Sequence, residues 1–330
     1  MNASEFVFGW ELQGRGEPAA KDIVLGVIMF VLCFFLVLLG SLNIYIVRKV
    51  EAFHNAFGWF WIARTCAEIT SNAVHVLYSA PVTIFQPKNI PLFLGFGALV
   101  VGGGGGTSSC ILHQAVSANR FIAVYKPLQY KFIFSKANCL KIIAACVMPV
   151  PFGLILTFVI PCNMVGFSPA MYGYSFVSCE PNYYRNYSVV GSVLNKFCLT
   201  VCSFTLFFDA ATLWKIVHIK LMNEVKTENK QLSRDIRFFM QASLQNVTMV
   251  ITTVFIALSD QKYSMDDEVE RILAFYMMLL AHLGNSFSLI LFNPEVRRFL
   301  FTKKVSDSGS STTTNASVPN VRCKRTTSHS

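Results

Sequence analysis

Long apolar segments alternate with shorter polar ones along most of this chain. An α-helix rises about 1.5 Å per residue, so about 20 apolar residues cross the hydrocarbon core of a bilayer. Segments of this length lie at 23–47, 57–80, 92–124, 140–162, 191–217, 238–258 and 272–292. The pattern predicts an all-α membrane protein, built as a bundle of seven transmembrane helices.

Two of these segments contain residues that a helix in lipid disfavours. The second carries Arg64 and Glu68, and the third holds consecutive glycines at 102–106, each costing up to about 1 kcal/mol relative to alanine. Polar groups inside a span indicate either function or hydrogen bonds that fix helix packing. Packing is the simpler interpretation for Asn43 and Asn285. Arg64 and Glu68 are spaced to pair with each other on one helix face.

Lysine and arginine are distributed unevenly between the two sides of this bundle. They concentrate in alternate loops and after the last span, which predicts that the N-terminus lies outside and the C-terminus inside. The predicted layout is an extracellular N-terminus at 1–22, a membrane domain at 23–304 and a disordered cytoplasmic tail rich in serine and threonine at 305–330. A short amphipathic helix is expected after the seventh span, at 293–301.

Sequons of the form Asn-X-Ser/Thr offer an independent test of this orientation. Asn2 and Asn186 begin sequons that fall outside, so they are candidate glycosylation sites. A sequon at Asn246 falls inside a span and another at Asn315 falls in the inner tail. Both of these are expected to stay unmodified.

Composition supports the membrane assignment and argues against a nucleic-acid partner. Hydrophobic residues make up 53% of the chain and charged residues 14%, against about 25% charged in soluble domains. The net charge is +10, but the basic residues sit at the ends of apolar segments rather than on a soluble face. The lipid bilayer is therefore the expected surrounding, and no nucleic acid is expected.

The motifs of common enzyme classes do not occur in the sequence. The glycines at 102–106 are not followed by the Gly-Lys-Ser/Thr step of a phosphate-binding loop. Glu68 and Asp209 are the carboxylates inside the predicted spans, and they form no evident catalytic pair. The ten cysteines show no metal-ligand spacing. No catalytic residue, metal site or cofactor is predicted. A small polytopic transporter or channel, and a non-signalling membrane scaffold, remain as alternatives.

The end of the third span is the most specific stretch of the chain. Asn119, Arg120 and Phe121 close this span and are followed by Pro127. Other matching positions are Cys162, Cys179, Phe208, Asp209, Asn293 and Pro294. In this order they resemble the nematode serpentine chemoreceptors of class X. Asn-Arg-Phe is also a variant of the Asp-Arg-Tyr motif of rhodopsin-like G-protein-coupled receptors.

The resemblance implies a chemosensory receptor that couples to a G protein. Arg120 is implied as the switch residue, which contacts neighbouring helices at rest and the G protein when active. Asn119, Phe121 and Pro127 are implied as parts of the same coupling region. Asn119 stands where the wider family has an aspartate, so a charge lock at that position lacks its acid.

The resemblance also implies partners and a location. The partners are a small-molecule chemical cue outside and a heterotrimeric G protein inside, with arrestin and a receptor kinase acting on the tail. The implied location is the plasma membrane of sensory-neuron cilia. Cys162 and Cys179 open and close one outer loop and are candidates for a disulfide.

Overall fold

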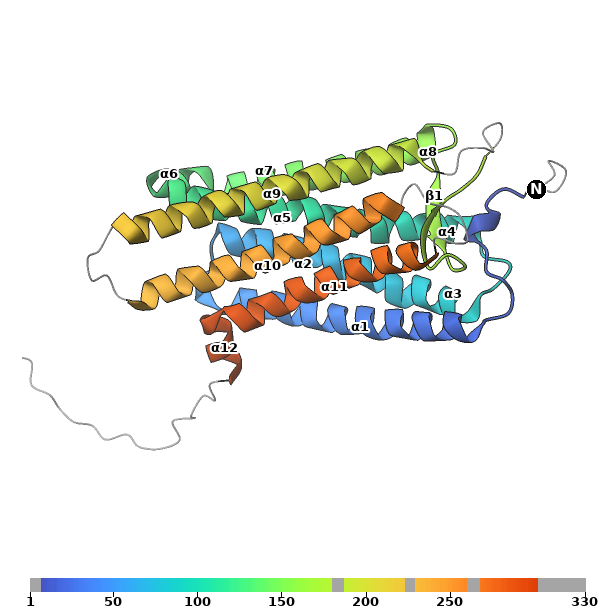
Figure 1. Cartoon of the computed structure of the whole chain (residues 1–330), viewed down its shortest axis with the longest axis horizontal. Helices are drawn as coiled ribbons and strands as arrows, with labels where there is room; N and C mark the ends of the chain where they lie inside the picture. Colours follow the sequence, from blue (N-terminus) through green and yellow to red (C-terminus); the bar gives the residue numbers. More distant parts are fainter. Residues whose placement is uncertain (1–6, 180–186, 223–228, 260–267, 302–330) are drawn as a thin grey trace, which may run out of the picture.

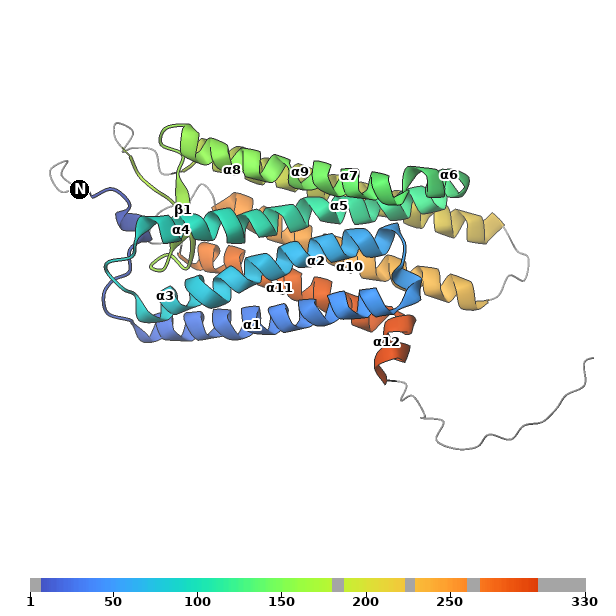
Figure 2. The same ribbon diagram turned by 180° about the vertical axis from the view of Figure 1, so that it is seen from behind.

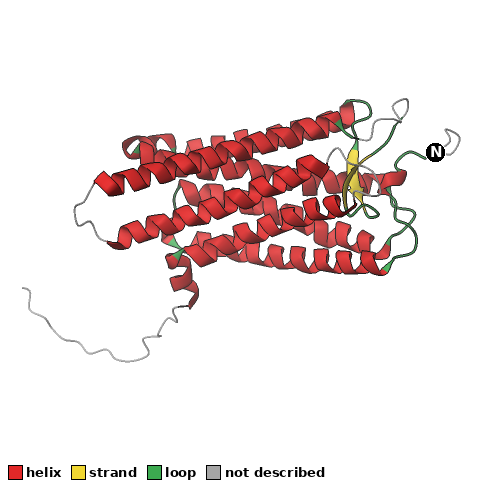
Figure 3. Ribbon diagram, viewed as in Figure 1, coloured by secondary structure: helices red, strands yellow, loops and turns green. Residues whose placement is uncertain are grey.

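Residues 7–179, 187–222, 229–259 and 268–301 are described by a computed structural model, without the side chains of 219–243. Most of them are helical (Figure 3) and form long rods that lie side by side (Figure 1). The helices are α1 (Ala20–Lys49), α2 (Ala56–Val74), α3 (Ala80–Phe85), α4 (Leu92–Ala98), α5 (Gly104–Tyr125), α6 (Pro127–Ile133), α7 (Lys136–Val147), α8 (Pro149–Val159), α9 (Val189–Met222), α10 (Asn229–Ser259), α11 (Glu268–Phe292) and α12 (Pro294–Phe301).

Three of the rods are assembled from more than one helix. A turn of π-helix, η4 (His75–Ser79), joins α2 to α3, and a second, η5 (Leu99–Gly103), joins α4 to α5. In the fourth rod α8 follows α7 and begins at Pro149, whose ring removes a backbone N–H from the helix ladder. With α1, α9, α10 and α11 as the other rods, the predicted seven-helix bundle is confirmed.

Five of the rods are long and apolar enough by themselves to cross a membrane. In the sixth rod the apolar part is shorter and covers Leu244–Ser259. The second rod is less apolar because it carries Arg64 and Glu68. Both of these weaker rods pack against more apolar neighbours, α10 against α9 and α11, and α2 against α1 and α5.

The glycines of the third rod allow a close approach between α5 and α2, which lie side by side in Figure 2. A Cβ atom on Gly105 would lie 2.8 Å from the carbonyl oxygen of Ala67 and 3.1 Å from the backbone nitrogen of Ser71. A side chain at this position would therefore collide with backbone that cannot move aside. Close helix packing offsets the poor helix propensity of this run.

The two ends of the bundle differ. At the hairpin end, strands β1 (Val165–Ser168) and β2 (Gly173–Phe176) pair antiparallel and lie close to the first described residues (Figure 1). At the α12 end, α12 turns away from the direction of α11 (Figure 1). The names hairpin end and α12 end assign neither end to a side of the membrane.

Apolar clusters lie toward both ends, with polar side chains between them. Toward the hairpin end the cluster includes Phe167 and Phe275, and toward the α12 end it includes Trp61 and Val296. Along α2 the buried side chains between the clusters are polar, namely Arg64, Thr65, Glu68, Ser71 and Asn72. On the side that α2 lines, the middle of the bundle is therefore held by hydrogen bonds, while Cys110, Cys202 and Met249 form a further apolar cluster between α5, α9 and α10.

The helix expected after the seventh span is α12. Asn293 caps its start, with the side-chain oxygen accepting hydrogen bonds from the backbone nitrogens of Glu295 at 3.0 Å and Val296 at 3.4 Å. Pro294 occupies the first helical position, where no N–H is needed. Val296 is fully buried against the bundle, whereas Arg297 and Arg298 are exposed. The helix is therefore amphipathic.

Candidate functional site

Arg120 lies near the end of α5 that is remote from the hairpin (Figure 1). Its guanidinium carbon is 5.2 Å from the ring centroid of Phe57, which is cation–π distance. Asp209 on α9 attracts Arg120 electrostatically. Ser117, one turn earlier on α5, donates a hydrogen bond of 2.6 Å to the Asp209 carboxylate. An acid from α9 therefore stands beside the cation, although position 119 has none.

The other three predicted coupling residues have different surroundings. The buried amide of Asn119 donates to the hydroxyl of Tyr130 on α6 at 3.1 Å, and Pro127 begins that helix. Phe121 packs against Phe208 of α9, with the ring centroids 5.2 Å apart. Asn119 and Pro127 thus position α6 and Phe121 joins α5 to α9, while Arg120 takes part in the charged contact.

A second cluster surrounds Glu68 in the middle of the bundle. The carboxylate is 3% exposed and accepts hydrogen bonds from Ser109 on α5 at 3.1 Å and from Asn285 on α11 at 2.9 Å. The Nε of Arg64 is 3.5 Å from the same oxygen, so these two residues do pair along α2. A buried carboxylate is tolerated when it is paired and hydrogen-bonded. This cluster ties α2, α5 and α11 together.

A chain of hydrogen bonds connects the Glu68 cluster with Asp209. Arg64 is fully buried over the ring of Trp61, 4.2 Å from its centroid, and its Nη1 lies 2.8 Å from Nδ1 of His113 on α5. The other ring nitrogen of His113 bonds the amide oxygen of Asn246 on α10. The amide nitrogen of Asn246 donates to Asp209. Four helices are joined in this way.

The two asparagines predicted to fix packing also lie between helices. Asn43 on α1 donates to the backbone oxygen of Ser286 on α11 at 3.0 Å. The backbone oxygen of Asn285 accepts from Gln245 of α10 at 3.2 Å, and Gln245 also bonds Ser288. These contacts add α1 and a second α10 contact to the polar network, which crosses six of the seven rods.

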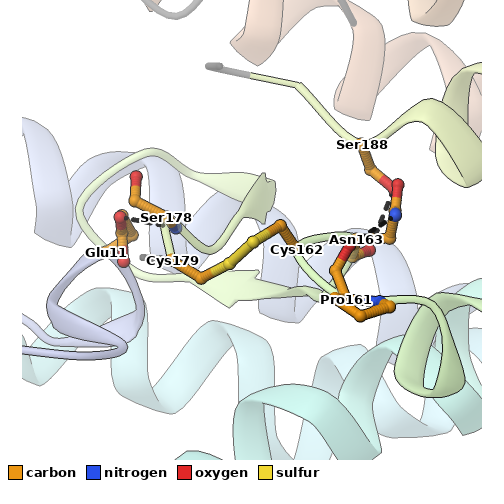
Figure 4. The surroundings of a disulfide bond; sticks show 7 residues. All are labelled: Glu11, Pro161, Cys162, Asn163, Ser178, Cys179 and Ser188. Carbon is orange, nitrogen blue, oxygen red and sulfur yellow. Dashed lines mark hydrogen bonds between the residues drawn. A yellow bond between two sulfur atoms is a disulfide. The ribbon is translucent and has the colours of Figure 1, made fainter. Parts of the chain in front are cut away.

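A disulfide closes the base of the hairpin, and hydrogen bonds fix the hairpin to the bundle. Cys162 and Cys179 form a disulfide, with their Cα atoms 5.4 Å apart (Figure 4). Beside it, the Glu11 carboxylate accepts from the backbone nitrogen of Ser178 at 3.0 Å (Figure 4). Tyr174 donates to the backbone oxygen of Ala98 at 3.1 Å. The hairpin therefore covers this end of the bundle.

An ion pair closes the hairpin over the start of α1. Arg15 donates to Asp22 at 2.8 Å and to the backbone oxygen of Ala170 at 2.8 Å. The hydroxyl of Tyr172, in the hairpin turn, also donates to Asp22. Burial, with this hydrogen bond, raises the pKa of Tyr172 to about 12. Tyr172 is therefore a neutral donor at physiological pH.

Aromatic rings gather directly beneath the hairpin. His75 in η4 lies edge-on to Phe275, with centroids 5.0 Å apart, and Phe167 of β1 lies 5.9 Å from Tyr174. Among the described residues, Nε2 of His75 and the hydroxyl of Tyr78 have no hydrogen-bond partner. This aromatic cluster presents apolar rings and two unsatisfied polar atoms, and π-helical turns are frequent at functional sites.

Several of these residues were not singled out by sequence reasoning. Asn246 was noted only as the start of a sequon, and its neighbour Gln245 was not noted. The available signal was two polar residues at the start of the apolar part of the sixth rod. Asn2 and Asn186, the predicted glycosylation sites, lie outside the described residues. Among the described residues no group of three or more His, Cys, Asp or Glu could hold a metal ion.

The arrangement of the seven rods defines the class. It is similar to the crystal structure of squid rhodopsin, with a TM-score of 0.66 and 12% sequence identity, over 92% of this chain and 86% of that one. The fold is that of a rhodopsin-like seven-helix membrane receptor. The model of the family described as "Serpentine type 7TM GPCR chemoreceptor Srx" matches residues 30–293, so the chain belongs to this family. No curated protein matches the chain significantly.

Proposed function

We propose that this chain is a chemosensory receptor that binds a small-molecule cue at the hairpin end and activates a heterotrimeric G protein at the α12 end. The observation that carries the proposal is the polar network, which joins six rods and ends beside Arg120. A network of this extent ties the positions of six rods to one another between the two ends of the bundle. Because the chain belongs to a chemoreceptor family, this coupling is proposed to carry the signal from a bound cue to a G protein.

The aromatic cluster beneath the hairpin supports the choice of the ligand-binding end. His75, Phe167 and Phe275 pack against one another, so a ligand that separates these rings would contact η4, β1 and α11 together. Nε2 of His75 and the hydroxyl of Tyr78 are available to hydrogen-bond it. Ligand pockets are commonly apolar, with a few polar groups that fix orientation.

The surface around Arg120 supports the choice of the G-protein end. On α6, Leu128 is 97% exposed and Phe132 is 84% exposed. Large apolar side chains exposed outside the spans indicate a protein-binding surface. The neighbouring Arg120 supplies a cation once it leaves Asp209. We therefore assign Asn119, Arg120, Phe121 and Pro127 to the coupling region.

The mechanism is a shift between two populations. An agonist stabilises the open arrangement of the α12 end because it binds that arrangement more tightly. The G protein binds the same arrangement, so each partner increases the affinity of the other. The distribution of lysine and arginine supports an orientation with the hairpin end outside the cell and the α12 end in the cytosol. We further propose that the receptor lies in the plasma membrane of sensory-neuron cilia. Arrestin and a receptor kinase are proposed to regulate it at the tail.

Replacement of Arg120 by alanine tests the coupling role. In cells challenged with a panel of volatile and water-soluble compounds, Arg120→Ala should reach the surface and lose agonist-driven G-protein activation. Lys126→Ala, which removes an exposed cation from the same end, is the matched control and should signal normally. Full signalling by Arg120→Ala contradicts the assigned role. Ion flux or current without nucleotide exchange, recorded in the same cells, favours a transporter or channel instead.

A further inference from the structure

The two end residues of the hydrogen-bond chain, Arg64 and Asp209, determine which group donates and which accepts in each of its bonds. A guanidinium can only donate and an ionised carboxylate can only accept. His113 therefore accepts from Arg64 through Nδ1 and carries its proton on Nε2. That N–H donates to the Asn246 oxygen, and the Asn246 amide donates to Asp209. Every donor points from the cation on α2 toward the anion on α9.

Asn246 is the member of this chain that α10 contributes. It is 1% exposed, and its two polar atoms contact different helices, the oxygen facing α5 and the nitrogen facing α9. Movement of α10 away from these helices breaks both bonds together. The N–H of His113 and one oxygen of Asp209 then lose partners inside the bundle, which is costly for buried polar groups. Asn246 therefore favours the closed position of α10.

The same side chain controls what Asp209 does to Arg120. The carboxylate is 5% exposed and is held from two sides, by Ser117 and by Asn246. Held in this position it attracts Arg120. When Asn246 moves away with α10, the Asp209 carboxylate loses one of the two hydrogen bonds that orient it, and α10 separates from α9. Arg120 is then less firmly retained inside the bundle.

We propose that Asn246 is an internal latch, which holds α10 closed against α5 and α9 and so keeps Arg120 beside Asp209 until an agonist acts. This inference rests on the proposed function, because opening of the α12 end is the change that the G protein detects. It assigns the latch to a residue of α10, outside the Asn-Arg-Phe stretch itself. Asn246 acts as a positioning residue through Asp209 and contacts neither ligand nor G protein.

Asn246→Leu tests the latch, because leucine is similar in size and makes neither hydrogen bond. Loss of buried hydrogen bonds should shift the ratio of open to closed receptor by about five- to thirty-fold. Nucleotide exchange on the G protein without agonist should rise accordingly. Thr248→Val is the control on the same helix, because the Thr248 hydroxyl bonds within α10, to the backbone oxygen of Gln245 at 2.8 Å. It should leave basal exchange unchanged. Asn246→Ala repeats the test if the leucine variant does not fold.

A distance measurement separates the latch from G-protein coupling. Nitroxide labels at Trp214→Cys on α9 and Leu244→Cys on α10 replace side chains that are 73% and 46% exposed, with the exposed Cys66 and the tail residue Cys323 changed to serine. The Asn246→Leu receptor should show a population at longer distance that Thr248→Val lacks. An unchanged distance distribution overturns the latch, whatever the exchange assay gives. A longer distance without increased exchange upholds the latch and overturns the proposed coupling.

Discussion

At the scale of single residues, Arg64 and Glu68 show how charges persist in the middle of a bundle that lipid surrounds. Arg64 is fully buried, yet its charge is met by Glu68, its plane stacks on Trp61 and one nitrogen bonds His113. A buried pair of this kind contributes little net stability compared with apolar residues, but each partner depends strongly on the other. The pair fixes a geometry more than it adds stability.

Removal of one partner should therefore be costly. Arg64→Leu leaves the Glu68 carboxylate without its cation and should lower the free energy of unfolding by about 3–5 kcal/mol. Thermal unfolding of the purified receptor in detergent measures the loss. The double variant Arg64→Leu, Glu68→Gln should regain part of it, because the buried charge is gone. A single variant as stable as wild type would show that the carboxylate needs no cation.

Tyr172 gives the hairpin end a dependence on alkaline pH. Burial and the hydrogen bond to Asp22 raise the pKa of Tyr172 from 10.0 to about 12, so the folded receptor holds the phenol in its neutral form. The stabilisation is fully present below the unfolded pKa and is lost as the pH rises through the folded pKa. The midpoint temperature of unfolding should fall mainly between about pH 10 and about pH 12. The Tyr172→Phe variant should have a lower midpoint temperature at neutral pH, and that temperature should fall less steeply as the pH rises. Equal pH dependence of the midpoint temperature in the two proteins would contradict the assignment.

At the scale of elements, α5 owes its position to small residues that meet backbone on α2. Two adjacent glycines differ sharply in their surroundings. A Cβ on Gly105 meets backbone atoms of Ala67 and Ser71, whereas the nearest atoms to a Cβ on Gly106 are side-chain atoms at 3.7 Å. The same substitution at the two positions therefore separates packing from helix propensity.

Gly105→Ala should destabilise the receptor by about 1–3 kcal/mol through overpacking against α2. Gly106→Ala should stabilise it by up to about 1 kcal/mol, because alanine favours helix and finds ordinary contact distances there. Thermal unfolding of both variants in the same detergent checks the prediction. Equal effects at both positions would mean that α2 and α5 are not in close contact at Gly105.

Sequence periodicity located the rods well and their internal breaks poorly. The predicted spans agree with the helical rods, because a length of apolar chain determines whether a helix crosses lipid. The second rod reaches Phe85 instead of residue 80, since α3 continues the helix with Pro81 in its first turn, where a missing N–H costs little. Neither π-helical turn was predicted. A π turn depends on tertiary contacts, such as the close approach of Gly102 in η5 to Tyr174 in β2.

The candidate site could likewise be predicted from the sequence only in part. Arg120 could be recognised because a cation ends a long apolar helix, and Asp209 because a carboxylate lies inside a span. The electrostatic attraction between these two residues could not be predicted, and neither could the contacts of Asn246 with His113 and Asp209. Each depends on the rotation of a helix about its axis, which nearly uniform apolar sequence does not specify.

At the scale of the whole molecule, the two ends are built for different tasks. The hairpin end is closed by a disulfide and by the ion pair of Arg15 with Asp22. At the α12 end α6 leaves large apolar side chains exposed. Disulfides persist in oxidising surroundings, which supports placing the hairpin end outside the cell.

Glycosylation tests this orientation directly. Asn2 and Asn186 should both be modified, so a glycosidase should increase the mobility of the wild-type receptor on a gel. The shift should vanish in the double variant Asn2→Gln, Asn186→Gln. A shift that persists in the double variant would mean that another sequon is modified, and the proposed topology would then be wrong.

The two π-helical turns also affect how this receptor can be compared with others. A π turn closes its hydrogen bonds over one residue more than an α turn. Each of η4 and η5 therefore accommodates one extra residue without displacing the helix on either side. Against a receptor whose second and third spans are uninterrupted α-helices, an ungapped alignment falls one position out of register beyond each of these turns. Buried residues beyond η4, such as Thr83 and Gln86, would then be matched with residues that face a different direction.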